Sequence, residues 1–463
     1  MRRILWFRRD LRADDNPLFA LEGEVLPIFI FDPAILSPLS HDDRRVTFIF
    51  EAVMNLREAL RKRKLELYLF HGKPQEVFAH LLSRGKFDEV CASGDYDGYA
   101  RERDRAISHL LPFRYLRDTY VFEPDEVCKS DGSPYLVFTP FYKRARELFR
   151  PDHMAERFPA PQRLIAFGND AIHSITPEGV SPLPVDLSSI GFSPIPLTPQ
   201  QRLSPSKKLS HFENRLSRYP TERDFPSLEA TSHLAADLRF GTISIRAVLR
   251  WLSEQKKKGI ETEPFFRELM FREFYAMLLY HFPRLKSENF RYPFAGVWNE
   301  TFARAFCQGR TGVPIVDAGI RELLESGEMH NRVRMVCASF WTKNLLLPWQ
   351  EGERFFAAHL LDYDAASNIL SWQWSAGTGV DPQPYFRIFN PYMQSKKFDP
   401  QGEYIRRWIP ELRGVDPNIL HDEAKLSKAD FNGYPRPLVD HKSSSKRAVE
   451  YFRKVLKSTP LLP

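Results

Sequence analysis

The first 130 residues alternate short apolar runs with amphipathic stretches. The apolar runs are continuous, which is typical of parallel strands that are covered on both faces. Between two of them, residues 44–63 repeat apolar positions at three- to five-residue steps, and this predicts a helix. The order predicts an α/β domain at residues 1–130 with a doubly wound, mostly parallel sheet. The expected strands are ILWF (4–7), VLPIFIF (25–31), LELYLF (65–70) and DEVCAS (88–93).

A proline-rich stretch follows this domain. Ten of the 36 prolines fall within residues 151–205. Because proline lacks a backbone N–H and breaks helices, long helices cannot persist there. We expect residues 131–205 to form an ordered but irregular interdomain connection, laid over a surface by its apolar residues; a disordered linker is the alternative.

From about residue 206 the hydrophobic period becomes helical and no strand pattern returns. This predicts an all-α domain at residues 206–463, which ends in a helix with the sequence SSSKRAVEYFRKVLKS. The other expected helices cover residues 242–258, 264–282, 314–326, 328–347 and 351–361.

Composition narrows the class of protein. With 43% hydrophobic and 27% charged residues, the 463-residue chain is typical of a soluble globular protein. No apolar run is long enough for a membrane helix, and the N-terminus does not have the pattern of a signal peptide. The four cysteines lie far apart without a CxxC pair, so we expect neither a disulfide framework nor a zinc site, and a cytoplasmic location. The net charge of +7 is compatible with a polyanionic partner but does not require one.

Charged and aromatic residues share one short segment, DYDAASNILSWQW (362–374). A buried carboxylate needs a partner, and Arg334 is a candidate for Asp362 or for Asp364. Asp362 and Asp364 are two residues apart and cannot point the same way, so one can hold an arginine while the other binds a ligand. No His or Cys cluster accompanies them, so we expect no metal site.

Three other segments combine polar residues on one helix face or at a helix start. Glu268, Phe271 and Arg272 share a face that suits a pocket wall, although a surface ion pair would also explain the pattern. Asn331, Arg334 and Met335 share another, typical of a helix at the edge of a cavity or of groups that satisfy buried carbonyls. The Thr-Ser pair at 231–232 predicts a helix cap, beside which free N–H groups could bind phosphate; a plain cap is the alternative.

In combination, these motifs resemble the photolyase/cryptochrome family, and most of all the class I cyclobutane pyrimidine dimer DNA photolyases. The resemblance spans almost the whole chain. It implies an α/β antenna-binding domain (1–130), a connection (131–205) and a helical FAD- and DNA-binding catalytic domain (206–463). The motifs that carry it, in order, are WFRRDLRADDNPLF (6–19), RFGTIS, ELMFREFYAMLLYHFP, GRTGVPIVDAGIREL (309–323), MHNRVRM, DYDAASN, WQWSAGTGVDPQPYFRIFNP and KFDPQGEYIRRWIPEL (397–412).

The resemblance also implies the residues around FAD. Arg334 corresponds to an arginine that pairs with Asp362 beside the flavin, and Asn368 to the residue that faces flavin N5. An amide there does not readily give up a proton, which favours the reduced anion FADH⁻. His233 and Ala235 stand where the family often has Arg and Ser, so fewer side-chain donors are expected. The expected FAD-binding residues are Tyr219, Thr231, Ser232, His233, Leu234, Ala235, Phe265, Glu268, Arg272, Asn331, Arg334, Asp362, Asp364 and Asn368.

The activity that the resemblance implies is light-driven repair of cyclobutane pyrimidine dimers in single- or double-stranded DNA by a monomer, a deoxyribodipyrimidine photo-lyase. Phe271 replaces the usual Trp, so we expect weaker lesion binding but not loss of repair. The expected catalytic residues are Glu268, Asn331, Asn368 and Trp374. The expected lesion- and DNA-binding residues are Phe271, Arg272, Arg332, Met335, Trp374 and Arg387, and flavin photoreduction is expected to use Trp372, Trp349 and Trp298.

Two matters stay open at this point. Tyr99 and Ala100 replace the Asn-Glu pair of folate-binding members, so a deazaflavin antenna, a flavin antenna or none is expected rather than methenyltetrahydrofolate. A cryptochrome-like blue-light photoreceptor without repair activity is the alternative function. Asn368 and the short sequence after the last predicted helix favour repair.

Overall fold

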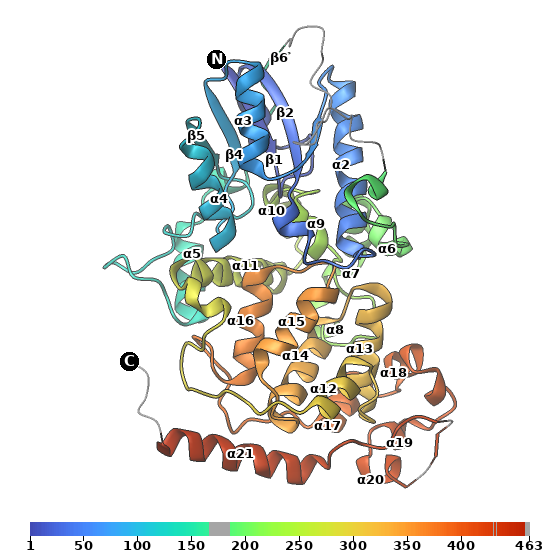
Figure 1. Ribbon diagram of the computed structural model, residues 1–463. Coiled ribbons are helices and arrows are strands. Elements are labelled where there is room, and N and C mark those ends of the chain that lie inside the picture. Colours follow the sequence, from blue (N-terminus) through green and yellow to red (C-terminus); the bar gives the residue numbers. More distant parts are fainter. Residues whose placement is uncertain (166–185, 429, 432, 459–463) are drawn as a thin grey trace. The chain divides into compact units, whose positions relative to one another are not determined.

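A computed structural model describes residues 1–165, 186–428, 430–431 and 433–458 (Figure 1). The chain divides into two compact units. Unit 1 comprises Met1–Pro134, Tyr142–His211 and Ser232–Pro283, and unit 2 comprises Tyr135–Phe141, Phe212–Thr231 and Arg284–Pro463.

Unit 1 is built around a parallel sheet with the order β3-β2-β1-β4-β5, and β6 pairs with β2. Each pairing is parallel, with Ile4 opposite Leu26 and Val90 in register across β1. The predicted doubly wound α/β class is confirmed. The strands are β1 (Arg2–Phe7), β2 (Gly23–Phe31), β3 (Tyr68–His71), β4 (Glu89–Ser93), β5 (Phe113–Leu116) and β6 (Gln162–Leu164).

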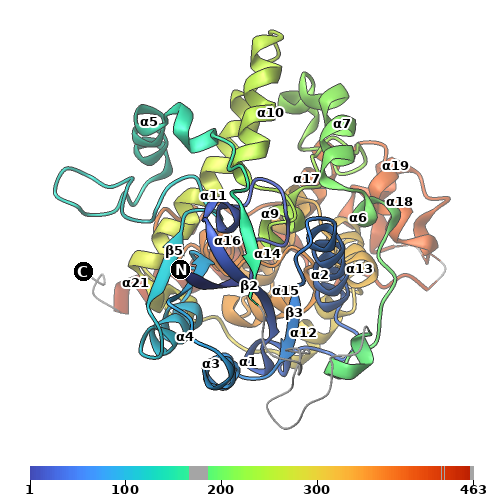
Figure 2. The same cartoon turned by 90° about the horizontal axis from the view of Figure 1, so that it is seen from above.

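Helices cover both faces of this sheet (Figure 2). On one face, α3 (Pro74–Arg84) and α4 (Gly98–Ser108) pack Phe78 and Ile107 into a core with Trp6. The predicted helix at 44–63 is α2 (Arg44–Lys62) on the other face, where Phe50 contacts Phe31 of β2 at a ring-centroid distance of 6.1 Å. Burial on both faces explains why the strands are continuous apolar runs.

Three helices of the expected catalytic domain lie in unit 1. They are α9 (Ala235–Phe240), α10 (Ile245–Lys257) and α11 (Glu263–His281). On α10, buried Arg246 pairs with Asp15 at 3.0 Å and with Asp118 at 2.7 Å. Pairs between residues so far apart in sequence tie the two segments together, and no local pattern predicts them.

The expected connection at 131–205 contains regular elements among its irregular segments. Some of its described prolines occupy helix starts, where the missing N–H costs nothing, as Pro199 does in α6 (Pro199–Arg202). Residues 166–185 of this stretch lie outside the described residues. The remaining elements of this region and of the first part of the chain are η1 (Pro17–Ala20), α1 (Pro33–Leu36), α5 (Phe138–Leu148), η2 (Pro151–Met154), η3 (Leu187–Ile190), α7 (Pro205–Leu216) and α8 (Tyr219–Glu222).

Unit 2 is helical around one large core that includes Trp341, Trp349 and Trp372. The predicted helices at 314–326 and 351–361 are α13 (Pro314–Ser326) and α15 (Trp349–His359), and the expected last helix is α21 (His441–Ser458). The predicted helix at 328–347 is interrupted: α14 (Asn331–Ser339) passes into a π-helical turn, η5 (Phe340–Asn344). The other elements are η4 (Pro283–Lys286), α12 (Glu300–Cys307), α16 (Ala365–Ala376), α17 (Pro391–Phe398), α18 (Glu403–Trp408), η6 (Pro410–Leu412), α19 (Pro417–Leu420) and α20 (Glu423–Leu426).

Within the described ranges, none of the helices combines the length and the apolarity that crossing a bilayer would require.

Candidate functional site

The predicted site residues fall in both units, and each group is described within its own unit. In unit 2, Arg334 of α14 pairs with Asp362. Its Nη2 lies 3.1 and 3.0 Å from the two carboxylate oxygens, and its Nε donates to the carbonyl of Met329 at 2.7 Å. Of the two carboxylates that the sequence offered, Asp362 is therefore the partner. The pair is only partly exposed, which strengthens its attraction relative to a surface pair.

Asp364, the second carboxylate, begins α16. Its Oδ1 accepts a hydrogen bond from the backbone N–H of Ser367 at 3.2 Å, so it is the N-cap of the helix. This cap fixes where α16 starts and therefore the direction in which the side chains that follow it point.

Asn368, one turn into α16, is 9% exposed, and its amide is held by a residue that the sequence did not identify. Its Nδ2 donates to Oε1 of Glu353 on α15 at 2.9 Å, and Tyr363 donates its hydroxyl to the same oxygen at 3.3 Å. Burial raises the pKa of Glu353. A carboxyl with two donors thus fixes the orientation of Asn368.

Trp372 and Trp374 lie two residues apart on α16, roughly opposite each other around the helix. Trp372 is buried in the core of unit 2, where its ring contacts those of Phe356 and Trp341 at centroid distances of 4.9 and 6.5 Å. Trp374 is half-buried on the other side of the helix. The two predicted roles, electron transfer and lesion binding, thus belong to two different faces.

The first five residues of α14 include the predicted DNA- and lesion-contacting residues of this helix. Asn331 is exposed and Met335 is half-buried. Arg332 is already paired, with Nη2 2.8 Å from Asp224 Oδ1, and its guanidinium lies 4.4 Å from the ring centroid of Phe398. A phosphate would therefore compete with Asp224 for this arginine.

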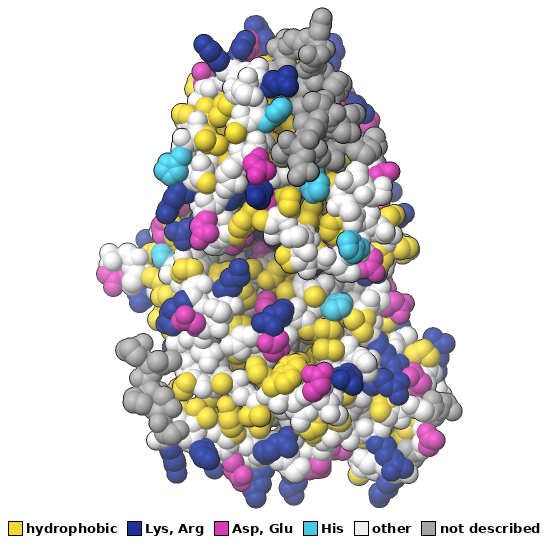
Figure 3. Space-filling view, in the orientation of Figure 1, with side chains coloured by type: hydrophobic (Ala, Val, Ile, Leu, Met, Phe, Trp, Pro, Cys, Tyr) yellow, Lys and Arg dark blue, Asp and Glu magenta, His cyan; other side chains and the backbone are white. Residues whose placement is uncertain are grey.

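Arg387 is exposed in the loop between α16 and α17, and among the described residues its guanidinium makes no ion pair. Other basic side chains of unit 2 follow α21, and Figure 3 shows Lys and Arg gathered along the edge where Figure 1 places this helix. An exposed, unpaired arginine is suited to a phosphate contact.

Tyr219 and Thr231 are the predicted phosphate-side residues of unit 2. Tyr219 is buried, with its ring T-shaped against Phe212 at 5.4 Å, while Thr231 is half-buried. Tyr219 thus packs in the interior of unit 2, whereas Thr231 is partly accessible to solvent.

In unit 1, Ser232–Ala235 lead into α9, and the predicted cap has to be corrected. The N-cap is Leu234 rather than Thr231 or Ser232, and no side chain caps the helix. Ser232 Oγ only accepts a 3.4 Å bond from Leu234 N, and His233 adopts a left-handed φ of 54°. With His233 in the left-handed conformation, the helix begins two or three residues later than the sequence suggests, and no side chain caps its first turn.

On α11 of unit 1, Glu268, Phe271 and Arg272 form a half-buried stripe, as their spacing predicts, and Phe265 is buried against Trp251. Arg272 is engaged within the unit. It donates to the carbonyls of Thr119 at 2.8 Å and Leu238 at 3.2 Å, and its guanidinium lies 4.3 Å from the ring centroid of Tyr120. Its first role is therefore to hold the loop around residue 119 to α11.

The neighbouring Glu273 is the fully buried acid of α11, and sequence reasoning missed it. It accepts hydrogen bonds from the backbone N–H groups of Val121 at 2.9 Å and Phe122 at 3.1 Å. Burial raises its pKa to about 7. The signal that could have identified Glu273 in the sequence is a carboxyl group among apolar neighbours on a predicted helix.

The carboxyl ends of the strands of unit 1, where ligands of such sheets bind, carry many charges. Arg8 pairs with Asp104 at 2.6 Å and Arg9 with Asp95 at 3.0 Å. Tyr99 donates its hydroxyl to Asp32. Ala100 is buried in the first turn of α4, 1% exposed. A carboxylate side chain at this position would need space that the turn does not provide.

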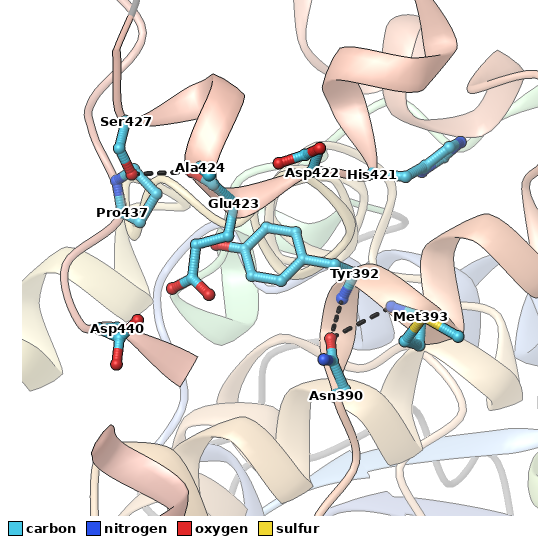
Figure 4. A pocket seen from close by; sticks show the side chains of 10 residues that line it. All are labelled: Asn390, Tyr392, Met393, His421, Asp422, Glu423, Ala424, Ser427, Pro437 and Asp440. Atoms are coloured by element: carbon cyan, nitrogen blue, oxygen red, sulfur yellow. Dashed lines mark hydrogen bonds between the residues drawn. The ribbon is translucent and has the colours of Figure 1, made fainter. Parts of the chain in front are cut away.

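A surface cavity of about 500 Å³ lies in unit 2 at α17 and α20, and none of its lining residues is a predicted site residue (Figure 4). Its polar groups serve the fold: Glu423 accepts from His441 N at 2.7 Å, and His421 Nδ1 bonds Ser395 Oγ at 2.7 Å. The ten residues that line it are Asn390, Tyr392, Met393, His421, Asp422, Glu423, Ala424, Ser427, Pro437 and Asp440.

In the part of the chain that the structure describes, no group of three or more His, Cys, Asp or Glu is arranged to hold a metal ion. The candidate chemistry is thus that of guanidinium, carboxylate, amide and indole groups.

Two family models match the chain. Residues 3–162 match the family model described as DNA photolyase, and residues 265–454 match that of the FAD binding domain of DNA photolyase.

Similarity to individual proteins extends over the full length. The chain is 36% identical to the "Deoxyribodipyrimidine photo-lyase" of Alkalihalophilus pseudofirmus, over 97% of this chain and 98% of that protein. It superposes on a bacterial class III photolyase from Agrobacterium tumefaciens with a TM-score of 0.83 and 32% identity, covering 99% and 98% of the two chains. An archaeal photolyase from Sulfolobus tokodaii, solved with two FAD molecules, gives 0.82 and 30%, covering 98% and 100%. The chain therefore belongs to the DNA photolyase family.

Proposed function

We propose that this chain is a light-driven repair enzyme that splits cyclobutane pyrimidine dimers in DNA and uses FAD in its reduced form, FADH⁻. Family membership and the matched FAD-binding domain support photorepair in general. The observation that supports the use of FADH⁻ is the fixed orientation of the Asn368 amide, whose Nδ2 donates a hydrogen bond to Glu353 at 2.9 Å.

The residues fit FAD in their chemistry. In unit 2, the Arg334–Asp362 pair and Asn368 offer a guanidinium, a carboxylate and an amide, the groups that can hydrogen-bond the edge of a flavin ring. In unit 1, the start of α9 has no side-chain cap, and its N–H groups can bind a phosphate. Leu234 and Ala235 contribute there through the backbone, so the departures at 233 and 235 remove few donors.

Bound FADH⁻ supplies the light-absorbing electron donor to the dimer, and the chain controls its surroundings. Asn368 is a neutral amide, so it can hydrogen-bond the flavin without releasing a proton at neutral pH. Its link to Glu353 keeps it in one orientation. Arg334 places positive charge beside the cofactor and stabilises the reduced anion.

The DNA side of the proposal uses the exposed and half-buried residues. Arg387 contacts a phosphate, and Arg332 does so by exchanging Asp224 for the DNA. Trp374 and Met335 in unit 2 and Phe271 in unit 1 contact the extruded bases, whose poor pairing lowers the cost of extrusion. Glu268 hydrogen-bonds a pyrimidine carbonyl and stabilises the negative charge that develops there. Arg272 supports α11 rather than the lesion.

The choice of lesion rests on Asn331 and Met335, which stand where (6–4) enzymes have a histidine. A cyclobutane dimer needs an electron but no acid at this position. For the antenna, buried Ala100 and the Tyr99–Asp32 hydrogen bond argue against methenyltetrahydrofolate. The antenna is then a flavin or a deazaflavin, or the protein binds none.

The test is repair of a thymine-dimer oligonucleotide by the FAD-loaded protein after chemical reduction, under near-UV or blue light and in the dark. Loss of dimers only in the light is expected, with no loss of (6–4) photoproducts. Unchanged dimers with reduced FAD bound would refute the proposal, and would leave the photoreceptor alternative. Glu268→Ala is expected to lower the yield of repair with FAD still bound; Glu325→Ala, in unit 2 on α13, is the control.

A further inference from the structure

We propose that Trp341, which the expected electron-transfer series does not include, relays electrons from Trp298 to Trp372 during photoreduction of the flavin. This rests on the proposed function, because it requires FAD bound near Trp372. Ring contacts within unit 2 carry the inference. The centroid of Trp341 lies 6.5 Å from that of Trp372 and 6.4 Å from that of Trp298, so one indole touches both ends of the series.

Local structure explains why Trp341 occupies this position. It lies in the π-helical turn η5, and its Nε1 donates to the carbonyl of Pro348 at 2.8 Å. Gly352 of α15 makes the space: a Cβ there would lie 2.4 Å from Cη2 of Trp372 and 3.0 Å from Nε1 of Trp341. Only a residue without a side chain lets both indoles pack against this helix.

The expected intermediate, Trp349, lies in the same core but makes other side-chain contacts. Its Nε1 donates to Oδ1 of Asn289 at 2.8 Å. Among the described residues, no ring-to-ring contact joins it to Trp372 or to Trp298, whereas Trp341 has both. Because electron tunnelling weakens steeply with distance, the pair of contacts favours the Trp341 branch.

Burial sets the direction of the relay. Trp372 and Trp341 are 2% and 1% exposed, whereas Trp298 is 51% exposed. With oxidised FAD bound and photoexcited, Trp372 would give up one electron, Trp341 would return one to Trp372, and Trp298 would return one to Trp341. The Nε1–H of Trp341 faces a backbone carbonyl, which is too weak a base to accept its proton, so this indole passes the positive charge on. Trp298 can release its Nε1 proton to water, and an external thiol then returns the electron.

The experiment measures photoreduction of FAD in the holoprotein with oxidised cofactor and a thiol reductant, followed by flavin absorbance and by the transient absorption of tryptophan radicals. The variants are Trp341→Phe, Trp349→Phe and the double variant. Trp408→Phe, another tryptophan of unit 2, is the control. FAD content is measured for each variant.

Trp341→Phe is expected to slow photoreduction by about tenfold or more, and Trp349→Phe by less than about threefold, with the control unchanged. Photoreduction at the wild-type rate in Trp341→Phe, or its loss in Trp349→Phe alone, would overturn the relay. Persistence in Trp349→Phe supports it even if Trp341→Phe fails to fold. Chemically reduced Trp341→Phe is expected to repair dimers like the wild type. If the reduced wild type repairs nothing, the proposed function fails, while the relay is still judged by photoreduction.

Discussion

The side-chain amide of Asn368 donates a 2.9 Å hydrogen bond to Oε1 of Glu353, and so links α16 to α15 at the residue expected to face the flavin. The amide nitrogen is committed to the carboxyl group. We therefore expect Glu353 to set the orientation of Asn368 toward the cofactor, although Glu353 itself does not contact the cofactor.

Glu353→Ala is expected to speed reoxidation of bound FADH⁻ in air by roughly fivefold, since one hydrogen bond contributes about 1 kcal/mol. The rate is read from the return of oxidised-flavin absorbance. Glu351→Ala on the same helix, which removes an exposed pair with Arg354, is the matched control. Equal reoxidation rates in Glu353→Ala and Glu351→Ala would show that the hydrogen bond between Glu353 and Asn368 does not affect the flavin.

Arg334→Met is expected to weaken FAD binding by about tenfold or more, because a charge-assisted contact to the cofactor contributes at least about 1.5 kcal/mol. Titration of the apoprotein by flavin fluorescence measures this. Arg321 offers a close control: it also binds a backbone carbonyl, of Gly309, and both oxygens of a carboxylate, Glu411. If Arg321→Met lowers the affinity equally, the loss comes from stability and not from contact.

Phe271→Trp is expected to tighten binding of dimer-containing DNA by about threefold, because indole offers a larger stacking surface than phenyl. The measurement is a titration in the dark. Phe266→Trp, on another side of α11 where the ring packs on Tyr142 and Phe149, is expected to have no such effect. An affinity for the lesion that stays at the wild-type value in Phe271→Trp would remove Phe271 from the lesion contact.

Lys343 gives a prediction for pH. Its side chain is buried, its Nζ donates to the carbonyl of Ala376 at 2.8 Å, and burial lowers its pKa from 10.5 to about 7. Between these values the unfolded chain binds one more proton than the folded chain, so this group's contribution to stability rises with pH. It is fully present above pH 10.5 and is lost as pH falls to about 7.

The free energy of unfolding of wild type minus Lys343→Met is therefore expected to rise by up to about 1.4 kcal/mol per pH unit from pH 7 to 10. Chemical denaturation at saturating FAD measures it, with exposed Lys396→Met as the control. A difference that does not change with pH would mean that Lys343 is charged in the folded protein.

Local sequence patterns predicted most helices and strands. They could not predict contacts between residues that are far apart in the sequence. The runs at 4–7 and 25–31 predicted β1 and β2 because both faces of these strands are buried. The sequence FRYL of β5 was missed because two of its four residues are exposed, which leaves no apolar run. Glu273 of α11 accepts hydrogen bonds from Val121 and Phe122, about 150 residues earlier in the chain, and no local pattern predicts such a contact.

In the candidate site, too, some residues could be predicted from the sequence and others could not. Arg334 was expected to pair with Asp362 or Asp364 because a buried carboxylate requires a partner, and the resemblance to the family then named Asp362. Glu353 and Trp341 were not identified, since their partners are set by how α15, α16 and the π-helical turn pack. Arg332 was predicted to grip phosphate, but its pair with Asp224 becomes visible only in the folded unit.

The action spectrum of dimer repair distinguishes light-driven repair by FADH⁻ from light absorption without repair. The chemically reduced, FAD-loaded protein is mixed with DNA that contains one thymine dimer, and the dimers split per photon absorbed are counted across the near-UV and blue range. Repair is expected to follow the absorbance of FADH⁻, together with that of any antenna bound, and to be absent in the dark. Absence of splitting at every wavelength, with FADH⁻ bound and the DNA in complex, would contradict this expectation.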